Sequence, residues 1–100
     1  MDCEVVWASE ALDDLRRLAS YIERDSPAYA SSVVKRVLDA TRRLATYPRS
    51  GRVVPELGDE AFRELLVHNY RVMYRVEEQT VTIAAIAHSR QSLGIDDLRS

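Results

Sequence analysis

The stretch that decides the fold reads Phe62-Arg63-Glu64-Leu65, then Tyr70-Arg71-Val72-Met73-Tyr74-Arg75-Val76, then Val81 to Ala87, and closes on His88-Ser89-Arg90. Polar turns at residues 68–69 and 77–79 divide runs of β-branched and aromatic residues, so the stretch predicts three consecutive strands. In the middle strand, tyrosines and valines alternate with Arg71, Met73 and Arg75, which therefore face the opposite side of the sheet. The last run is nearly apolar on both faces, which indicates the central strand.

Two amphipathic helices are predicted upstream of these strands. Apolar residues recur at helical spacing from Ala8 to Ile22 and again from Ala30 to Ala45. Ser9 and Ser26 stand where helix N-caps are expected, and Pro48 ends the second helix. Because the connection between the helices is so short, they must run antiparallel as a hairpin.

A short strand at residues 3–7 is predicted before the helices, because apolar and polar residues alternate there. The expected order is β-α-α-β-β-β, an α+β fold with a helical hairpin on one face of a mostly antiparallel four-stranded sheet. The first strand must join through a crossover, and we expect it to run parallel to the last strand. Residues 47–60 hold two prolines and two glycines without any period, and ordered loops of this length are often functional. Residues 1–100 are expected to form a single domain, with 93–100 as a short turn or frayed tail.

Composition narrows the classes of function. Apolar residues make up 46 % and charged residues 30 % of the chain, an ordinary globular balance. No apolar run approaches the ~18 residues that cross a bilayer, and the acidic N-terminus lacks a signal-peptide layout, so we expect a cytoplasmic protein without membrane contact. The net charge of −2 weighs against whole-surface attraction to nucleic acid. Cys3 is the single cysteine, which excludes an internal disulfide.

The motifs of several enzyme classes are missing. The chain has no Gly-rich phosphate loop, no His-x-x-x-His or Cys-x-x-Cys pair and no Gly-x-Ser-x-Gly. The carboxylates are scattered over the predicted helix faces and turns. We therefore expect no metal and no cofactor, and a metal enzyme, a protease or a nucleotide hydrolase is disfavoured.

The residues that remain as candidates for chemistry are the strand-borne cations. Arg71 and Arg75 are four residues apart on one face of a strand, about 13 Å along it. On a face that the helices leave open, they would bind a polyanion or stabilise charge on a phosphate, with His88 as acid or base. The alternative is that these arginines only solubilise an open face and pair with Glu64, Glu77 and Glu78.

Several segments together resemble the ParE/RelE superfamily of bacterial type II toxins. The order and spacing of the segments carry the resemblance, and the predicted β-α-α-β-β-β order agrees with that family's fold. The segments span residues 5–93 and read Trp7-x-x-x-Ala11-x-x-Asp14-Leu15, Tyr21-Ile22-x-x-Asp25-x-Pro27-x-x-Ala30, Leu44-x-x-x-Pro48-x-x-Gly51-Arg52-x-Val54-Pro55-Glu56-Leu57, Arg63-Glu64-Leu65, Tyr70-Arg71-Val72-x-Tyr74-Arg75, and Val81-x-Ile83 ending on His88-Ser89-Arg90.

The resemblance implies one of two targets. RelE-like members cut mRNA on the ribosome, and Arg71 and Arg90 match their two catalytic arginines, with His88 as a possible third group. Their lysine pair and C-terminal tyrosine have no counterpart here. The segments at residues 51–57 and 63–65 are more similar to the ParE branch, which is implied to poison DNA gyrase by protein contact.

In either branch the resemblance implies a cognate antitoxin and hence a hetero-oligomer. An apolar groove by the helical hairpin would suit such a partner. A degenerate binding module without toxicity is the third alternative. The residues expected to dock the target or the antitoxin are Arg52, Arg63, Tyr70, Arg71, Tyr74, Arg75 and Arg90.

Overall fold

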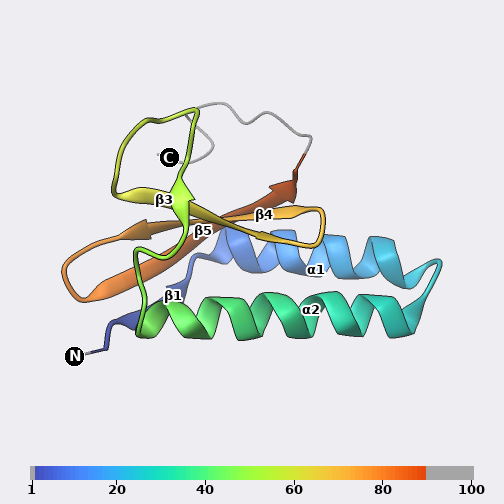
Figure 1. Ribbon diagram of the computed structural model, residues 1–100. Coiled ribbons are helices and arrows are strands. Elements are labelled where there is room, and N and C mark those ends of the chain that lie inside the picture. Colours follow the sequence, from blue (N-terminus) through green and yellow to red (C-terminus); the bar gives the residue numbers. More distant parts are fainter. Residues whose placement is uncertain (1, 90–100) are drawn as a thin grey trace.

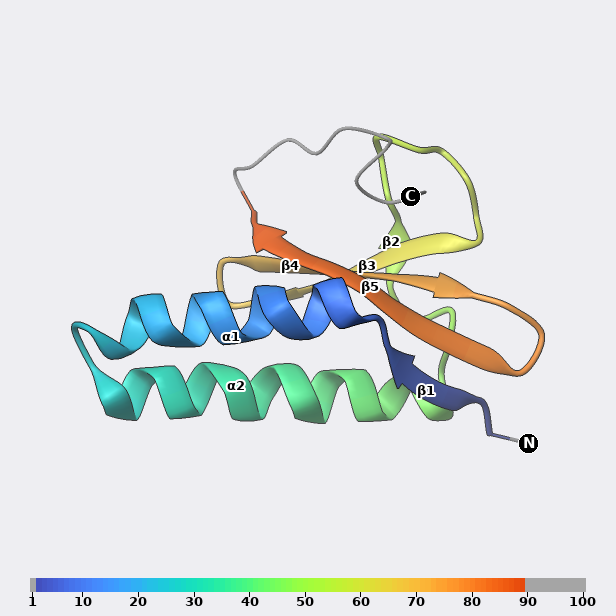
Figure 2. The same ribbon diagram turned by 180° about the vertical axis from the view of Figure 1, so that it is seen from behind.

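The computed structural model describes residues 2–89 and places a helical hairpin against one face of a sheet (Figures 1 and 2). The strands and helices follow in the order β1 (Glu4–Trp7), α1 (Ser9–Glu23), α2 (Pro27–Arg42), the 3₁₀ turn η1 (Arg43–Ala45), β2 (Arg52–Val53), β3 (Phe62–Val67), β4 (Tyr70–Val76) and β5 (Thr80–His88). The predicted α+β class is confirmed, and the predicted helices and strands occur in the expected sequence, with one additional strand between α2 and β3. The predicted tail at 93–100 and Arg90 lie outside the described residues.

The sheet has five strands in the order β1-β5-β4-β3-β2, so the predicted count of four is wrong. The additional strand is β2, which pairs antiparallel with β3 through Arg52↔Glu64 and Val53↔Arg63. Two residues are too few to show a period, and Gly51 and Pro55 flank them, so the sequence does not reveal this strand. The predicted crossover is confirmed, because β1 runs parallel to β5.

The two helices cover one face of the sheet and enclose the main core. The helices contribute Ala11, Leu15, Val33 and Val37, which are buried against strand residues such as Tyr74, Val81 and Ile83. Ser26 caps α2 as predicted, since its hydroxyl accepts a hydrogen bond from the backbone N–H of Tyr29 at 3.1 Å. Ser9 does not cap α1: the helix begins one residue earlier than expected, with Ala8 at the N-cap position.

A bulge in β5 changes which of its side chains reach the core. The pairing with β4 moves from Met73↔Ala85 to Tyr74↔Ile83, so Ala84 is an extra residue. With strict alternation, the side chain of Ile86 would lie on the other face of the sheet from those of Val81 and Ile83. Because of the bulge, all three side chains lie in the same core. Because β1 pairs with β5 only as far as Ile83, the carboxylate of Asp14 in α1 accepts the backbone N–H of Ile86 at 3.0 Å.

The opposite face of the sheet is covered by the chain from β2 to β3, which forms a second, smaller core. Val54 is buried there against Met73 and Ala87, with Leu57 and Phe62 packed at its margin. Figures 1 and 2 show this segment on the far side of the sheet from the helices. The face that carries Arg71 is therefore enclosed over part of its area.

Candidate functional site

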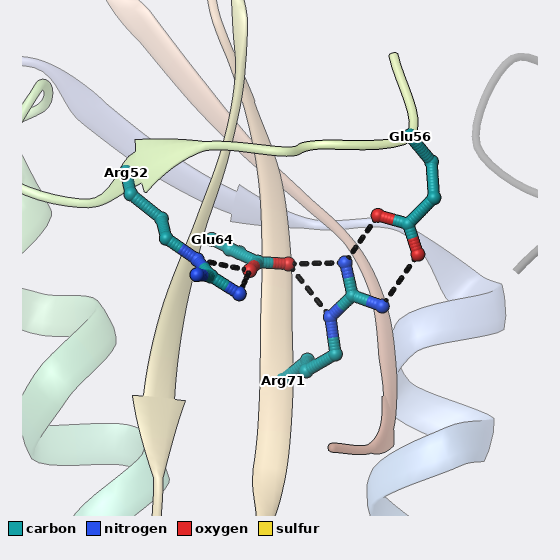
Figure 3. A network of polar contacts seen from close by, with 4 residues as sticks. All are labelled: Arg52, Glu56, Glu64 and Arg71. Carbon is teal, nitrogen blue, oxygen red and sulfur yellow. Dashed lines mark hydrogen bonds and ion pairs between the residues drawn. The ribbon is translucent and has the colours of Figure 1, made fainter. Parts of the chain in front are cut away.

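Arg71 lies at the centre of a buried ion network on this second face (Figure 3). Its guanidinium donates to both carboxylate oxygens of Glu56, from Nη1 to Oε2 at 2.7 Å and from Nη2 to Oε1 at 2.6 Å. On its other side, Nε donates to Oε1 of Glu64 at 2.7 Å. The Arg71 side chain is only 6 % exposed and that of Glu64 is fully buried. Both charges are thus compensated inside the protein, as a buried pair requires.

Arg52 extends the network to the surface. Its Nε donates to Oε2 of Glu64 at 2.6 Å, so that one carboxylate binds two guanidiniums. The Arg52 side chain remains 61 % exposed. β2 and β3 place Arg52 and Glu64 opposite each other, and the alternation of β3 and β4 brings Arg71 to the same face.

The network keeps Arg71 charged. Its hydrogen bonds with Glu56 raise the pKa of Arg71; burial acts in the opposite direction, and Glu64 raises the pKa further. The guanidinium therefore has donors directed at two carboxylates rather than at solvent. The expectation that Arg71 lines an open face is wrong, because the segment containing Val54 and Glu56 covers it.

Arg63, in β3, binds the backbone of the loop rather than a carboxylate. Its guanidinium donates to three backbone carbonyl oxygens, those of Glu60 at 3.0 Å, Arg49 at 3.3 Å and Gly51 at 3.0 Å. These three carbonyls belong to the chain on either side of β2. Arg63 therefore holds the two ends of the loop against the edge of the sheet.

Tyr74 supports the same loop from inside the main core. Its side chain is fully buried, and its hydroxyl accepts the backbone N–H of Gly51 at 2.9 Å. Burial raises the pKa of Tyr74, while the Gly51 hydrogen bond and the nearby charge of Arg63 oppose the shift. A β-carbon at Gly51 would lie 2.5 Å from the carbonyl oxygen of Glu64 and 2.6 Å from the Tyr74 hydroxyl. Only glycine fits so close to the sheet at this position.

The other predicted site residues lie apart from this network. Arg75 is half-exposed and pairs with Glu77 at 2.7 Å, as the solubilising alternative expected. Tyr70 is half-buried and its ring meets that of exposed His88 edge-on, with centroids 5.8 Å apart. Burial raises the pKa of Tyr70. The structure thus joins Arg52 with Arg71, and Tyr70 with His88, but it does not gather all these residues into one site.

Two carboxylates that complete the network were not predicted as site residues. Glu64 was expected only as a surface partner of the arginines, yet it is the most deeply buried charged group among them. The signal for it is an acid within an apolar strand, on the same face of the sheet as an arginine of the next strand that lies diagonal to it. Glu56 gives no such signal, because it lies in a loop without a period.

No three His, Cys, Asp or Glu side chains within residues 2–89 form a group that could hold a metal ion. None of the helices in that range is long and apolar enough to cross a membrane. A groove of about 500 Å³ does lie on the helical hairpin. Its lining mixes apolar and charged side chains, namely Ala19, Glu23, Ala30, Ser31, Val34, Lys35, Leu38, Asp39 and Arg42.

Comparison with known proteins now identifies the family. Residues 5–93 match the model of the ParE toxin of the type II toxin-antitoxin system parDE. The chain belongs to the ParE toxin family. It is also 36 % identical over 87 residues to Y4kP of Sinorhizobium fredii, a protein named as a toxin, with 85 % of this chain and 86 % of that protein covered. The resemblance to type II toxins that the sequence motifs indicated is confirmed.

Solved structures of ParE and RelE systems share the fold of this ParE-family chain. The chromosomal ParDE system of P. aeruginosa superposes with a TM-score of 0.70 at 19 % identity, covering 86 % of this chain and 95 % of that chain. A free variant of the E. coli toxin RelE gives 0.64 at 16 % identity, covering 90 % and 86 %. The toxin-antitoxin complex RelBE2 of Mycobacterium tuberculosis gives 0.59 at 22 % identity, covering 88 % and 99 %. At these identities the likeness establishes the common fold.

Proposed function

We propose that this ParE-family chain inhibits DNA gyrase by protein contact and is neutralised by a cognate antitoxin. The observation that supports gyrase over mRNA cleavage is the state of Arg71. This residue matches an arginine that a RelE-like nuclease uses on its substrate, but here its guanidinium is bonded to Glu56 and Glu64 in a buried site. An RNA phosphate would have to displace both carboxylates. Glu56 binds the guanidinium through two oxygens, and Glu64 binds it from a fully buried position.

The distribution of charge supports the same choice. Buried Glu64 and partly exposed Glu56 put negative charge where the phosphate would have to bind, and like charges repel each other. The chain as a whole carries a net charge of −2, which does not favour approach to a polyanion. Neither the local repulsion of a phosphate nor the net negative charge disfavours a target that is recognised through a folded protein surface.

The test of the target compares two purified systems. We expect the chain to inhibit supercoiling of relaxed plasmid by DNA gyrase, while mRNA in an in vitro translation reaction keeps intact ends by primer extension. Normal supercoiling combined with new mRNA ends would replace this proposal with ribosome-dependent cleavage. Harmless expression without any antitoxin, together with inactivity in both assays, would favour a binding module that has lost toxicity.

The groove on the helical hairpin supports an antitoxin partner. Val34 and Leu38 give it a half-buried apolar floor, and Lys35 and Arg42 stand at its margin. Both cations pair with Asp39, so the apolar floor is what a partner would bind. An amphipathic helix fits such a groove, which is a recurring mode of peptide recognition. This groove lies on the helices, whereas the ion network lies on the opposite face of the sheet, so that the two surfaces can be altered separately.

The antitoxin test uses Val34→Asp, with Leu12→Asp as its matched control. Leu12 is 37 % exposed on α1 and does not line the groove. We expect the antitoxin encoded beside this gene to rescue growth in the presence of the parent chain and the Leu12 variant, but not of the Val34 variant. Equal rescue of all three would place the antitoxin elsewhere.

A further inference from the structure

We infer that residues 47–55 form the surface with which this toxin contacts its target, and that Arg63 and Arg71 are positioning residues for it. The target would offer an acidic protein surface to this segment. The inference rests on the proposed function for the identity of the target as DNA gyrase. It assigns the contact to a segment of the chain outside the helical groove.

Several hydrogen bonds fix this loop to the sheet. Arg63 binds the carbonyls of Arg49 and Gly51, Tyr74 binds the N–H of Gly51, and the N–H of Val54 donates to the carbonyl of Phe62 at 2.9 Å. The Glu56–Arg71 pair then holds the turn that follows. A loop with this many ties loses little conformational entropy when it binds a partner.

The ion network around Arg71 fixes the position of the loop. Removing charges such as Arg71 and Glu64 from water costs free energy, and well-packed apolar side chains would stabilise a fold at least as well. Directional hydrogen bonds to Glu56 give something that apolar packing does not, which is a defined position of the loop relative to the sheet. The network is therefore better explained by loop geometry than by stability.

The loop presents several exposed side chains to solvent. Tyr47 is 64 % exposed and the Arg52 side chain 61 %, and Arg49 and Pro55 are exposed as well. Tyrosine and arginine are the residue types that most often dominate binding energy at protein interfaces. They stand here on a segment that the structure holds in place.

The charge of the segment defines the partner. Residues 47–55 contain Arg49 and Arg52 and no acid. Arg49 has no ion pair within residues 2–89, whereas the charges of Arg52 and Arg71 are balanced by the two carboxylates of Glu64 and Glu56. Positive charge therefore remains at the surface of the loop. Carboxylates on the partner would complement it and steer association.

The test replaces both surface arginines, as Arg49→Gln/Arg52→Gln. The matched control is Arg36→Gln/Arg43→Gln, which removes two exposed arginines from the helical side of the molecule. We expect the loop variant to need at least a tenfold higher concentration to inhibit gyrase supercoiling, and to arrest growth at least tenfold less effectively, while the control equals the parent chain. Tyr47→Ala should act in the same direction as the loop variant.

The positioning function is tested with Glu56→Gln, which keeps the size of the side chain and removes its charge. We expect weaker gyrase inhibition, NMR amide shifts concentrated at residues 49–60, and unchanged shifts in α1 and α2. Full inhibition despite those shifts would show that loop position is irrelevant to the target.

The outcomes separate the inference from the proposed function. Equal losses in the loop variant and the control, or full potency of the loop variant, would overturn the contact surface. If the parent chain arrests growth without inhibiting gyrase, the proposed target is wrong. The contact surface is then tested by comparing growth arrest by the loop variant with growth arrest by the control variant. A parent chain that neither arrests growth nor inhibits gyrase would overturn both the proposed function and the contact surface. Binding of a 20-base-pair duplex that depends on Arg49 and Arg52, measured by fluorescence anisotropy, would replace the acidic protein surface with nucleic acid.

Discussion

Arg71 in β4 donates two hydrogen bonds to the carboxylate of Glu56, a loop residue 15 positions earlier in the chain. This contact fastens the loop after β2 to the sheet on the side that the helices leave uncovered. Glu64 completes the site from β3 and is shared with Arg52 at the surface. A strand arginine that resembles a catalytic residue by its position in the sequence is thus part of the scaffold.

Loss of Glu64 should strongly destabilise the protein. Glu64→Ala leaves the buried guanidinium of Arg71 with an incomplete set of partners, and breaking a buried pair typically costs about 3–5 kcal/mol. Urea denaturation should show this loss in the free energy of unfolding. Glu77→Ala removes the partner of Arg75 from an exposed pair and should cost about 0–1 kcal/mol. Similar losses in the two variants would contradict the burial of the network.

Gly51 should tolerate substitution far less well than Gly58. In Gly51→Ala the new β-carbon would meet a backbone oxygen at 2.5 Å, and the crowding should cost about 1–3 kcal/mol or more. Gly58 has φ of +60° but open space around it, so Gly58→Ala should cost about 1 kcal/mol. Thermal unfolding followed by circular dichroism measures both. A larger loss at Gly58 would mean that β2 does not approach β3 so closely.

Stability should fall at alkaline pH through Tyr74. Burial raises its pKa in the folded state above the ordinary value of 10.0, so the unfolded chain ionises first. The stabilisation is complete below about pH 10 and is lost as the pH rises through the folded-state pKa, with a slope approaching about 1.4 kcal/mol per pH unit. Tyr74→Phe should make the free energy of unfolding less dependent on pH in this window. Tyr21→Phe, which removes an exposed hydroxyl, serves as the control and should not.

The two helix starts should respond differently to loss of a serine. Ser26→Ala removes the hydroxyl that accepts the N–H of Tyr29 and should cost about 1 kcal/mol. Ser9 makes no capping bond to α1, so Ser9→Ala should change the free energy of unfolding by only a few tenths of that amount. Equal effects of the two substitutions in urea denaturation would show that the cap at Ser26 contributes nothing specific.

The parts of the fold that the sequence predicted are those with a local period. The stripes of α1 and α2 and the alternation of β4 identify their elements, because each pattern repeats over several turns or residues. The candidate site was predicted only in part. Arg71 was correctly placed on the face opposite Tyr74, but its burial depends on a loop whose path no local pattern indicates.

The sequence by itself determined the order of helices and strands, the antiparallel hairpin of helices and the parallel crossover of the first strand, because periodicity and connection length act locally. The tertiary structure alone decided the fifth strand, the bulge at Ala84 and the pairing of Arg71 with Glu56 and Glu64. Each of these depends on which segment packs against another, and hence on contacts between residues distant in the chain. Arg71 contacts carboxylates rather than solvent because the loop between β2 and β3 packs over this face of the sheet.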